Sequence, residues 1–167
     1  MKKIIKKGIV LCCILTVILA CNSKKMDIFS DDAIDPAEIK AEIVALETKM
    51  AEMYNLRSAA SEEYYAEDAI SFTQNKAPLV GKLAIDKSIN EALSKFNSGD
   101  KISFSANEIF PSADGEQVVE LGNYKVVNSN NDMIYKGNYM SLFVKKEGKY
   151  ACIRNVVTSD LPIVLPQ

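Results

Sequence analysis

The sequence contains no histidine, and it has little cysteine beyond its N-terminus. Without histidine the chain lacks the commonest general base, so serine–histidine and cysteine–histidine catalytic pairs are excluded within it. Cys12, Cys13 and Cys21 lie in or beside an apolar N-terminal segment, which leaves only Cys152 further along. These positions favour neither a disulfide framework nor a thiolate metal cluster, and we expect no metal and no cofactor. With no histidine beside it, Cys152 is expected to be a packed thiol.

The sequence also lacks a cluster of basic residues outside its first few positions. The formal net charge is -2, but the first twenty residues hold four lysines and no acid. Without them, sixteen basic residues remain against twenty-two acidic ones, a net charge of about -6. Nucleic-acid binding needs clustered Lys and Arg to neutralise phosphates, so we expect no nucleic-acid partner.

The N-terminus has the pattern of a secretion signal. Four lysines precede an apolar run over residues 8–20, which is too short to span a hydrocarbon core of about 30 Å. The run ends in Ile-Leu-Ala-Cys, which resembles the bacterial lipobox, and this resemblance implies diacylation of Cys21. Because acyl chains contribute about 0.8 kcal/mol per buried methylene, they would hold the protein on a membrane. We therefore expect a lipid-anchored protein of the bacterial cell envelope.

The remaining sequence divides into three parts. Residues 21–34 are polar without sustained periodicity and predict a tether between the lipid and the domain. Residues 35–161 have the alternating elements of one folded domain, and residues 162–167 form a tail that begins at Pro162.

Helical patterns dominate the first half of the domain. Asp35 before Pro36 predicts a helix start, and apolar residues at helical spacing continue it to about Asn55. We expect a second short helix over residues 58–65, a short strand over 69–72 and a helix over 82–96.

Four longer strands complete the domain. The last two form a hairpin over residues 137–157 around a polar turn at 145–149, in which Gly148 supplies positive φ. Strict alternation places Arg154 on the same face as Tyr150 and Cys152. Since both faces of the hairpin are largely apolar, we expect it to be an inner pair covered on two sides. The order of elements predicts an α+β fold with N-terminal helices on one face of a curved mixed β-sheet.

Several short motifs, in this order and spacing, resemble the SnoaL-like branch of the nuclear transport factor 2-like (NTF2-like) superfamily. They are Tyr-Ala-Glu-Asp-Ala-Ile at 65–70, Gly-Lys at 81–82, Asp-Gly at 114–115, Gly-Asn-Tyr at 137–139 and Lys-Glu-Gly-Lys-Tyr at 146–150. The likeness covers residues 39–159 and implies a cone-shaped sheet around a pocket, often in a homodimer built through the sheet. Members often carry Trp where this chain has Tyr150.

The resemblance does not imply one reaction, because the superfamily includes ketosteroid isomerases, polyketide cyclases and dehydratases. An isomerase-like member would carry a carboxylate base just beyond the first short strand, where this chain has Ser-Phe-Thr-Gln at 71–74. Cyclase-like members commonly use a His–Asp arrangement, which this chain cannot supply. The catalytic residues of those subfamilies therefore do not transfer.

Two carboxylates remain as weak catalytic candidates. Asp68 lies at the mouth of the first strand, where desolvation would raise its pKa and suit it as a general base; otherwise it is a cap or turn acceptor. Glu120 shares a strand face with Gly122 and Tyr124, so it faces a ligand if that face lines the pocket and water if it does not.

A second set of candidates would line a ligand pocket. Tyrosines give apolar walls with polar tips, although each could equally be a core or interface residue. Arg154 lies within a strand and needs a carboxylate, from Glu120, from Asp68 or from a ligand. The candidate ligand-binding residues are Tyr54, Tyr65, Tyr124, Tyr139 and Arg154.

Three functions fit these patterns. The first is a pocket domain on an envelope lipoprotein that binds a small amphipathic molecule without strong catalysis. The second is an isomerase- or dehydratase-type enzyme with Asp68 or Glu120 as base and a tyrosine hydroxyl at the oxyanion. The third is an interaction module whose sheet face dimerises or docks another envelope protein.

Overall fold

The computed structural model describes residues 34–58 and 63–162, and the following account concerns this part of the chain. Cys21, the signal segment, nearly all of the predicted tether and the end of the tail lie outside it. Neither of the two helices in the described part of the chain is long and apolar enough to cross a bilayer.

Helix α2 (Pro36–Asn55) forms where the sequence predicted it. Asp35 caps the helix, accepting a hydrogen bond from the Ala37 amide at 2.8 Å, and Pro36 occupies the first turn. The buried stripe contains Ile39, Ile43, Met50 and Met53, so the predicted core face is confirmed. It also contains a charged residue, Glu47.

Helix α3 (Lys82–Leu93) follows the two-residue strand β2 (Leu79–Val80) and ends three residues before the predicted limit. The amides of Lys95 and Phe96 bond the carbonyls of Ala92 and Leu93, so the last turn tightens to i→i−3 bonds.

Residues 59–62 of the predicted short helix over residues 58–65 lie outside the described part of the chain. The predicted end of this helix is wrong, because Tyr65 begins strand β1 (Tyr65–Thr73). Tyr65 is buried and pairs with Cys152 of strand β6 (Lys149–Val157), so sheet pairing overrides the local helical pattern. The strand is also longer than the predicted segment over residues 69–72.

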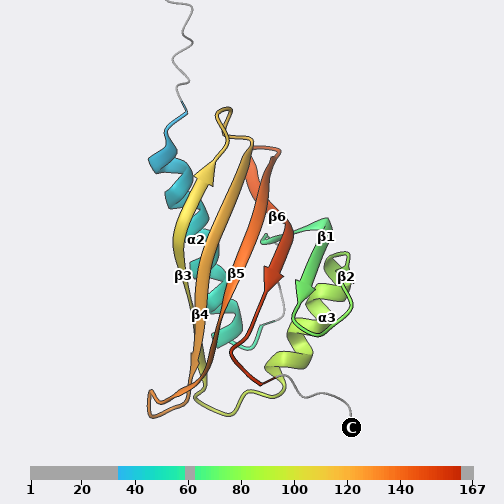
Figure 1. The fold of residues 1–167 in the computed structure, drawn as a ribbon, viewed down its shortest axis with the longest axis vertical. Coiled ribbons are helices and arrows are strands. Elements are labelled where there is room, and N and C mark those ends of the chain that lie inside the picture. The colour runs from blue at the N-terminus through green and yellow to red at the C-terminus, as the bar shows by residue number, and fades with distance from the viewer. Residues whose placement is uncertain (1–33, 59–62, 163–167) are drawn as a thin grey trace, which may run out of the picture. The chain divides into compact units, whose positions relative to one another are not determined.

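The six strands form one mixed sheet in the order β2-β1-β6-β5-β4-β3, with β3 at Lys101–Pro111, β4 at Gln117–Val127 and β5 at Met133–Lys146. The β1–β6 pair is parallel and the others are antiparallel. Figure 1 shows the sheet curving around the helices, with α2 behind β3 and β4 and α3 beside β1 and β2. The predicted α+β fold, with a curved mixed sheet and helices on one face, is confirmed.

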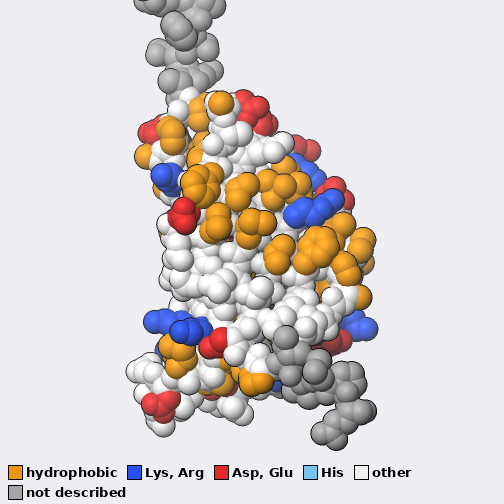
Figure 2. All heavy atoms as spheres, in the orientation of Figure 1, with side chains coloured by type: hydrophobic (Ala, Val, Ile, Leu, Met, Phe, Trp, Pro, Cys, Tyr) orange, Lys and Arg blue, Asp and Glu red, His pale blue; other side chains and the backbone are white. Residues whose placement is uncertain are grey.

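The β5–β6 hairpin lies inside the sheet as predicted, with Glu147 and Gly148 both at positive φ in its turn. The prediction that both faces of the hairpin are covered is wrong, however, because apolar residues on its outer face are exposed. Phe72, Val156, Met140 and Leu121 pair in register across four strands, and each is 37–48% exposed. Figure 2 shows apolar side chains gathered over this face. Helices within the described residues cover only the opposite, concave face.

Candidate functional site

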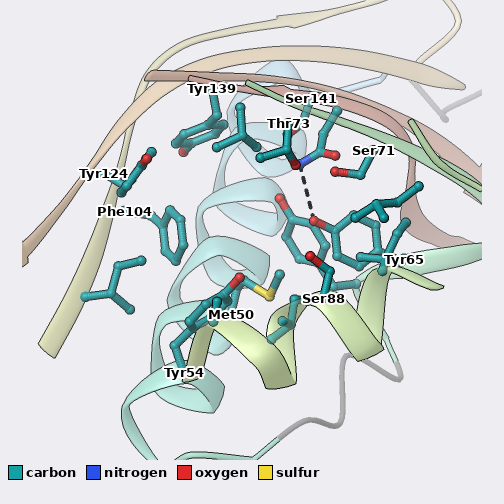
Figure 3. Close-up of a pocket in the computed structure, with 18 of the residues that line it drawn as sticks. Met50, Tyr54, Tyr65, Ser71, Thr73, Ser88, Phe104, Tyr124, Tyr139 and Ser141 are labelled. Atoms are coloured by element: carbon teal, nitrogen blue, oxygen red, sulfur yellow. Dashed lines mark hydrogen bonds between the residues drawn. The ribbon is translucent and has the colours of Figure 1, made fainter. Parts of the chain in front are cut away.

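A cavity of about 240 Å³ lies between the concave face of the sheet and helices α2 and α3. Its walls are mainly aromatic and aliphatic, as Figure 3 shows, and the strands approach it from one side and the helices from the other. The aromatic lining residues are Tyr54, Tyr64, Tyr65, Phe96, Phe104, Tyr124, Tyr135 and Tyr139. This is the composition of a pocket for a small molecule with substantial apolar surface.

A row of buried polar side chains crosses the concave face at one level, and we call it the polar row. Glu120 pairs with Ser141, Ser141 with Asn155, and Asn155 with Ser71, so β4, β5, β6 and β1 each contribute one residue. The four residues are at most 6% exposed, and all except Glu120 line the cavity. On each of these strands one adjacent residue belongs to the exposed apolar row of the outer face, because successive side chains alternate between faces.

A bulge in β6 decides which of its residues face the cavity. Phe143 pairs with Cys152 but Leu142 pairs with Arg154, so Ile153 is the extra residue and the alternation inverts after it. Asn155 and Val157 therefore join the cavity wall. Arg154 turns away from it, and its Nη1 donates to the carbonyl oxygens of Asp68 and Ile153. Its predicted place on the face of Tyr150 and Cys152 is wrong for this reason.

Three buried polar atoms around the row have no hydrogen-bond partner among the described residues: Glu120 Oε2, Ser141 Oγ and Asn155 Oδ1. The Asn155 amide uses its Nδ2 to donate to the Tyr65 hydroxyl at 3.2 Å, which leaves the carbonyl end to accept. Unpaired buried polar atoms are costly and uncommon, and these three belong to neighbouring residues of one row.

Glu47 on helix α2 interacts with Glu120, the β4 member of the polar row. Tyr64 donates to Glu47 Oε1, and Tyr139 donates to Glu120 Oε1 at 2.9 Å. Burial, and then the neighbouring Glu120 carboxylate, raise the pKa of Glu47 to about 9. Burial likewise raises the pKa of Glu120. Like charges this close cannot both ionise easily, so the two carboxyls retain a proton between them near neutral pH.

The four predicted ligand-binding tyrosines all lie on the cavity wall. The Tyr124 hydroxyl donates to the Thr158 carbonyl at 3.0 Å, and the Tyr54 ring meets Phe104 edge-on. Burial is the first cause of a raised pKa at all four, so their hydroxyls stay neutral. The structure thus brings Tyr54, Tyr65, Tyr124 and Tyr139 together, while their part in binding stays a prediction.

The two catalytic candidates lie in opposite environments. Glu120 is fully buried on the concave face. The Asp68 side chain is 72% exposed and forms an ion pair with Lys146 at 2.9 Å. The hydrogen bond from Lys146 lowers the pKa of Asp68, contrary to the raised pKa expected from desolvation. Asp68 is therefore a surface carboxylate, and it cannot serve as a base inside the cavity.

Sequence reasoning missed four wall residues: Glu47, Ser71, Asn155 and Tyr135. Glu47 had a usable signal, since it lies four residues after Ile43 within an apolar helical stripe, where a charged side chain must be buried. Cys152 is fully buried, and burial raises the pKa of its thiol, so it stays protonated. Among the described residues, no group of three His, Cys, Asp or Glu could hold a metal ion.

The curved sheet and the helices over its concave face (Figure 1) define a cone-shaped α+β fold. No family model and no curated protein matches the sequence. Solved structures do, including a Nostoc punctiforme domain of unknown function with a cystatin-like fold (TM-score 0.65, 14% identity, covering 77% of this chain and 82% of that one). An NTF2-like protein from Novosphingobium aromaticivorans matches with TM-score 0.62 and 16% identity, over 73% of this chain and 82% of that one.

ActVI-ORFA from Streptomyces coelicolor matches with TM-score 0.60 and 12% identity, over 74% of this chain and 98% of its own. The fold of this chain is therefore cystatin-like and NTF2-like, as the motifs predicted. At such identities the likeness concerns the fold alone.

Proposed function

We propose that this domain binds a small amphipathic molecule in the cavity between its helices and the concave face of the sheet. The observation that supports this is the combination of an aromatic wall with a buried polar row in which three atoms lack partners. A volume of about 240 Å³ is below the usual range of ligand pockets, which begins near 300 Å³, so the ligand is small.

Catalysis of isomerase or dehydratase type is the second candidate, and the Glu47–Glu120 pair favours it. A carboxyl pair that retains one proton contains both an acid and a base. The cavity wall includes Glu47 but not Glu120, and Asp68 lies on the outer surface. A base able to reach the ligand would therefore have to be Glu47, but its raised pKa keeps it protonated and so unable to act as a base at neutral pH. For this reason we propose ligand binding as the first function and catalysis as the second.

Filling the cavity is expected to abolish binding. Ser88 lies on the α3 side of the cavity wall, so Ser88→Trp places an indole in the ligand's space. We expect uptake of the neutral fluorescent probe N-phenyl-1-naphthylamine to fall at least ten-fold. The matched control is Leu83→Trp on the same helix, at a position 84% exposed, which should leave uptake unchanged. Equal uptake by wild type and Ser88→Trp would contradict the proposal.

The membrane tether is a further part of the proposed function. We propose that Cys21 is diacylated and holds the domain on a membrane of the bacterial envelope, supported by the basic segment, the apolar run and the Ile-Leu-Ala-Cys motif. In a bacterial host, Cys21→Ser should release the protein from the membrane fraction and abolish its labelling by radioactive palmitate. A variant that stays membrane-bound after a carbonate wash would contradict lipidation.

We also propose that the outer face of the sheet binds a second copy of this chain. In support, the apolar row of Phe72, Val156, Met140 and Leu121 spans four strands, and Phe110 of β3 adds a fifth exposed apolar side chain. The outer face of an antiparallel sheet in water normally carries polar residues. A two-fold pairing through this face would match the homodimers implied by the superfamily resemblance.

A further inference from the structure

The polar row indicates what the ligand carries at its polar end. Two of the three unpaired atoms belong to residues of the cavity wall: Asn155 Oδ1 can only accept a hydrogen bond, and Ser141 Oγ can accept while it donates. Glu120 lies off the wall and interacts with Glu47. Ser141 and Asn155 lie on the cavity wall beside Glu47. A ligand that satisfies Asn155 Oδ1 must therefore supply at least one hydrogen-bond donor.

The charges around the cavity indicate which kind of hydrogen-bond donor the ligand carries. Of the described residues that line the cavity, the charged or ionisable acids and bases are Glu47 and Lys76, apart from tyrosines. Lys76 is an exposed loop residue, whereas Glu47 is 4% exposed and meets Glu120. A carboxylate ligand would face these carboxyls unfavourably, while a cation would be attracted to them.

We propose that the cavity recognises a protonated amine, a small molecule whose ammonium group donates to the polar row beside Glu47 and whose ring or hydrocarbon body lies against the aromatic wall. This inference rests on the proposed binding function and adds the chemical class of the ligand to it. It assigns Ser141, Asn155 and Glu47 to the ammonium end, and Tyr54, Phe104 and Tyr124 to the apolar end.

Binding of a cation here has a consequence for protons. An ammonium group beside the carboxyl pair favours its doubly ionised form, so the pair should release a proton when the amine binds. Other titratable groups near the pair are Tyr54, Tyr64, Tyr65, Tyr139 and Cys152, whose pKa values are all raised by burial. Because burial holds the pKa values of these groups further above neutral pH than that of Glu47, the carboxyl pair is the group that gives up its proton most readily.

The test compares three probes with the same ring and different polar ends: 2-phenylethylammonium, 2-phenylethanol and phenylacetate. Titration calorimetry on the purified protein at pH 7, in two buffers of different ionisation enthalpy, gives both affinity and proton release. We expect the amine to bind at least ten-fold more tightly than the alcohol, phenylacetate to bind most weakly, and a fraction of a proton or more to be released with the amine alone.

Substitution separates this inference from a general apolar cavity. Glu47→Gln keeps an acceptor for Tyr64 but cannot ionise, so the second negative charge no longer forms when the amine binds. We expect it to abolish the proton release and to reduce the ten-fold preference while alcohol binding persists. Ser141→Ala, which removes one unpaired oxygen, is a second variant that should weaken amine binding at least three-fold. Glu108→Gln, an exposed carboxyl on β3, is the matched control and should change nothing.

The outcomes distinguish failure of the amine inference from failure of the proposed binding function. If the alcohol binds as well as the amine, or if phenylacetate binds best, the amine inference is overturned and the amphipathic pocket stands. If no probe binds although N-phenyl-1-naphthylamine is taken up, the amine inference is again overturned. If neither the probes nor the dye bind, the proposed binding function itself fails.

Discussion

Met140→Asp is expected to convert a dimer of this chain into monomers. Met140 is 48% exposed in the middle of the outer apolar row, between Val156 on β6 and Leu121 on β4. In a two-fold interface through this face both copies would bury the new carboxylate without a partner. Sedimentation equilibrium should show the dissociation constant raised at least about 100-fold, which corresponds to about 2.7 kcal/mol.

A matched substitution tests whether the position or merely the added charge matters. Ile134→Asp makes a similar apolar-to-acid change near the start of β5, at a residue 44% exposed. It lies six residues from Met140 and thus about 20 Å along the strand. We expect Ile134→Asp to remain dimeric. A wild-type protein that is monomeric at high micromolar concentration would overturn the dimer, and equal weakening by both variants would move the interface away from the row.

The predicted elements that proved right depend on local signals. Asp35 before Pro36 caps α2 whatever follows, and Gly148 in a polar turn makes the β5–β6 hairpin whichever sheet it joins. The fold class then follows from the order of elements. The predicted helix over residues 58–65 failed at Tyr65 because a long-range parallel pairing with β6 decided that residue, and no local pattern encodes such a pairing.

Which residues line the site depends on the bulge at Ile153, which the alternation of polar and apolar residues in the sequence does not reveal. Without the bulge at Ile153, Arg154 would face the cavity and Asn155 the outer surface, and both arrangements fit the same sequence of polar and apolar residues. Because of the bulge, the cavity wall carries the Asn155 amide in place of the Arg154 guanidinium. The ligand group expected at this position therefore changes from a carboxylate to a hydrogen-bond donor. Tyr139 and Glu120 needed no such correction, because β4 and β5 are in regular register around them.

The pH dependence of stability provides the largest expected effect on the folded state. The pKa of Glu47 is about 9 in the folded protein and close to its ordinary value of 4.5 in the unfolded chain. Between these values the folded form holds a proton that the unfolded chain releases, so raising the pH favours unfolding. From pH about 5.5 to about 8.5, the free energy of unfolding should fall by up to about 1.4 kcal/mol per pH unit for one extra bound proton.

Glu47→Gln should remove most of this slope, because a glutamine cannot ionise and can still accept the hydrogen bond from Tyr64. The exposed carboxyls of Glu63, Asp68 and Asp114 have lowered pKa values, so the stability they contribute is lost only as the pH falls below their unfolded values near 4. These three carboxyls therefore do not change the pH dependence of stability above pH about 5.5. Urea unfolding followed by circular dichroism at half-unit pH steps measures the slope, with Glu108→Gln as the variant that should retain it. A wild-type stability that is flat or rises across this window would mean that Glu47 is ionised in the folded state, and the shared proton of the carboxyl pair would then be excluded.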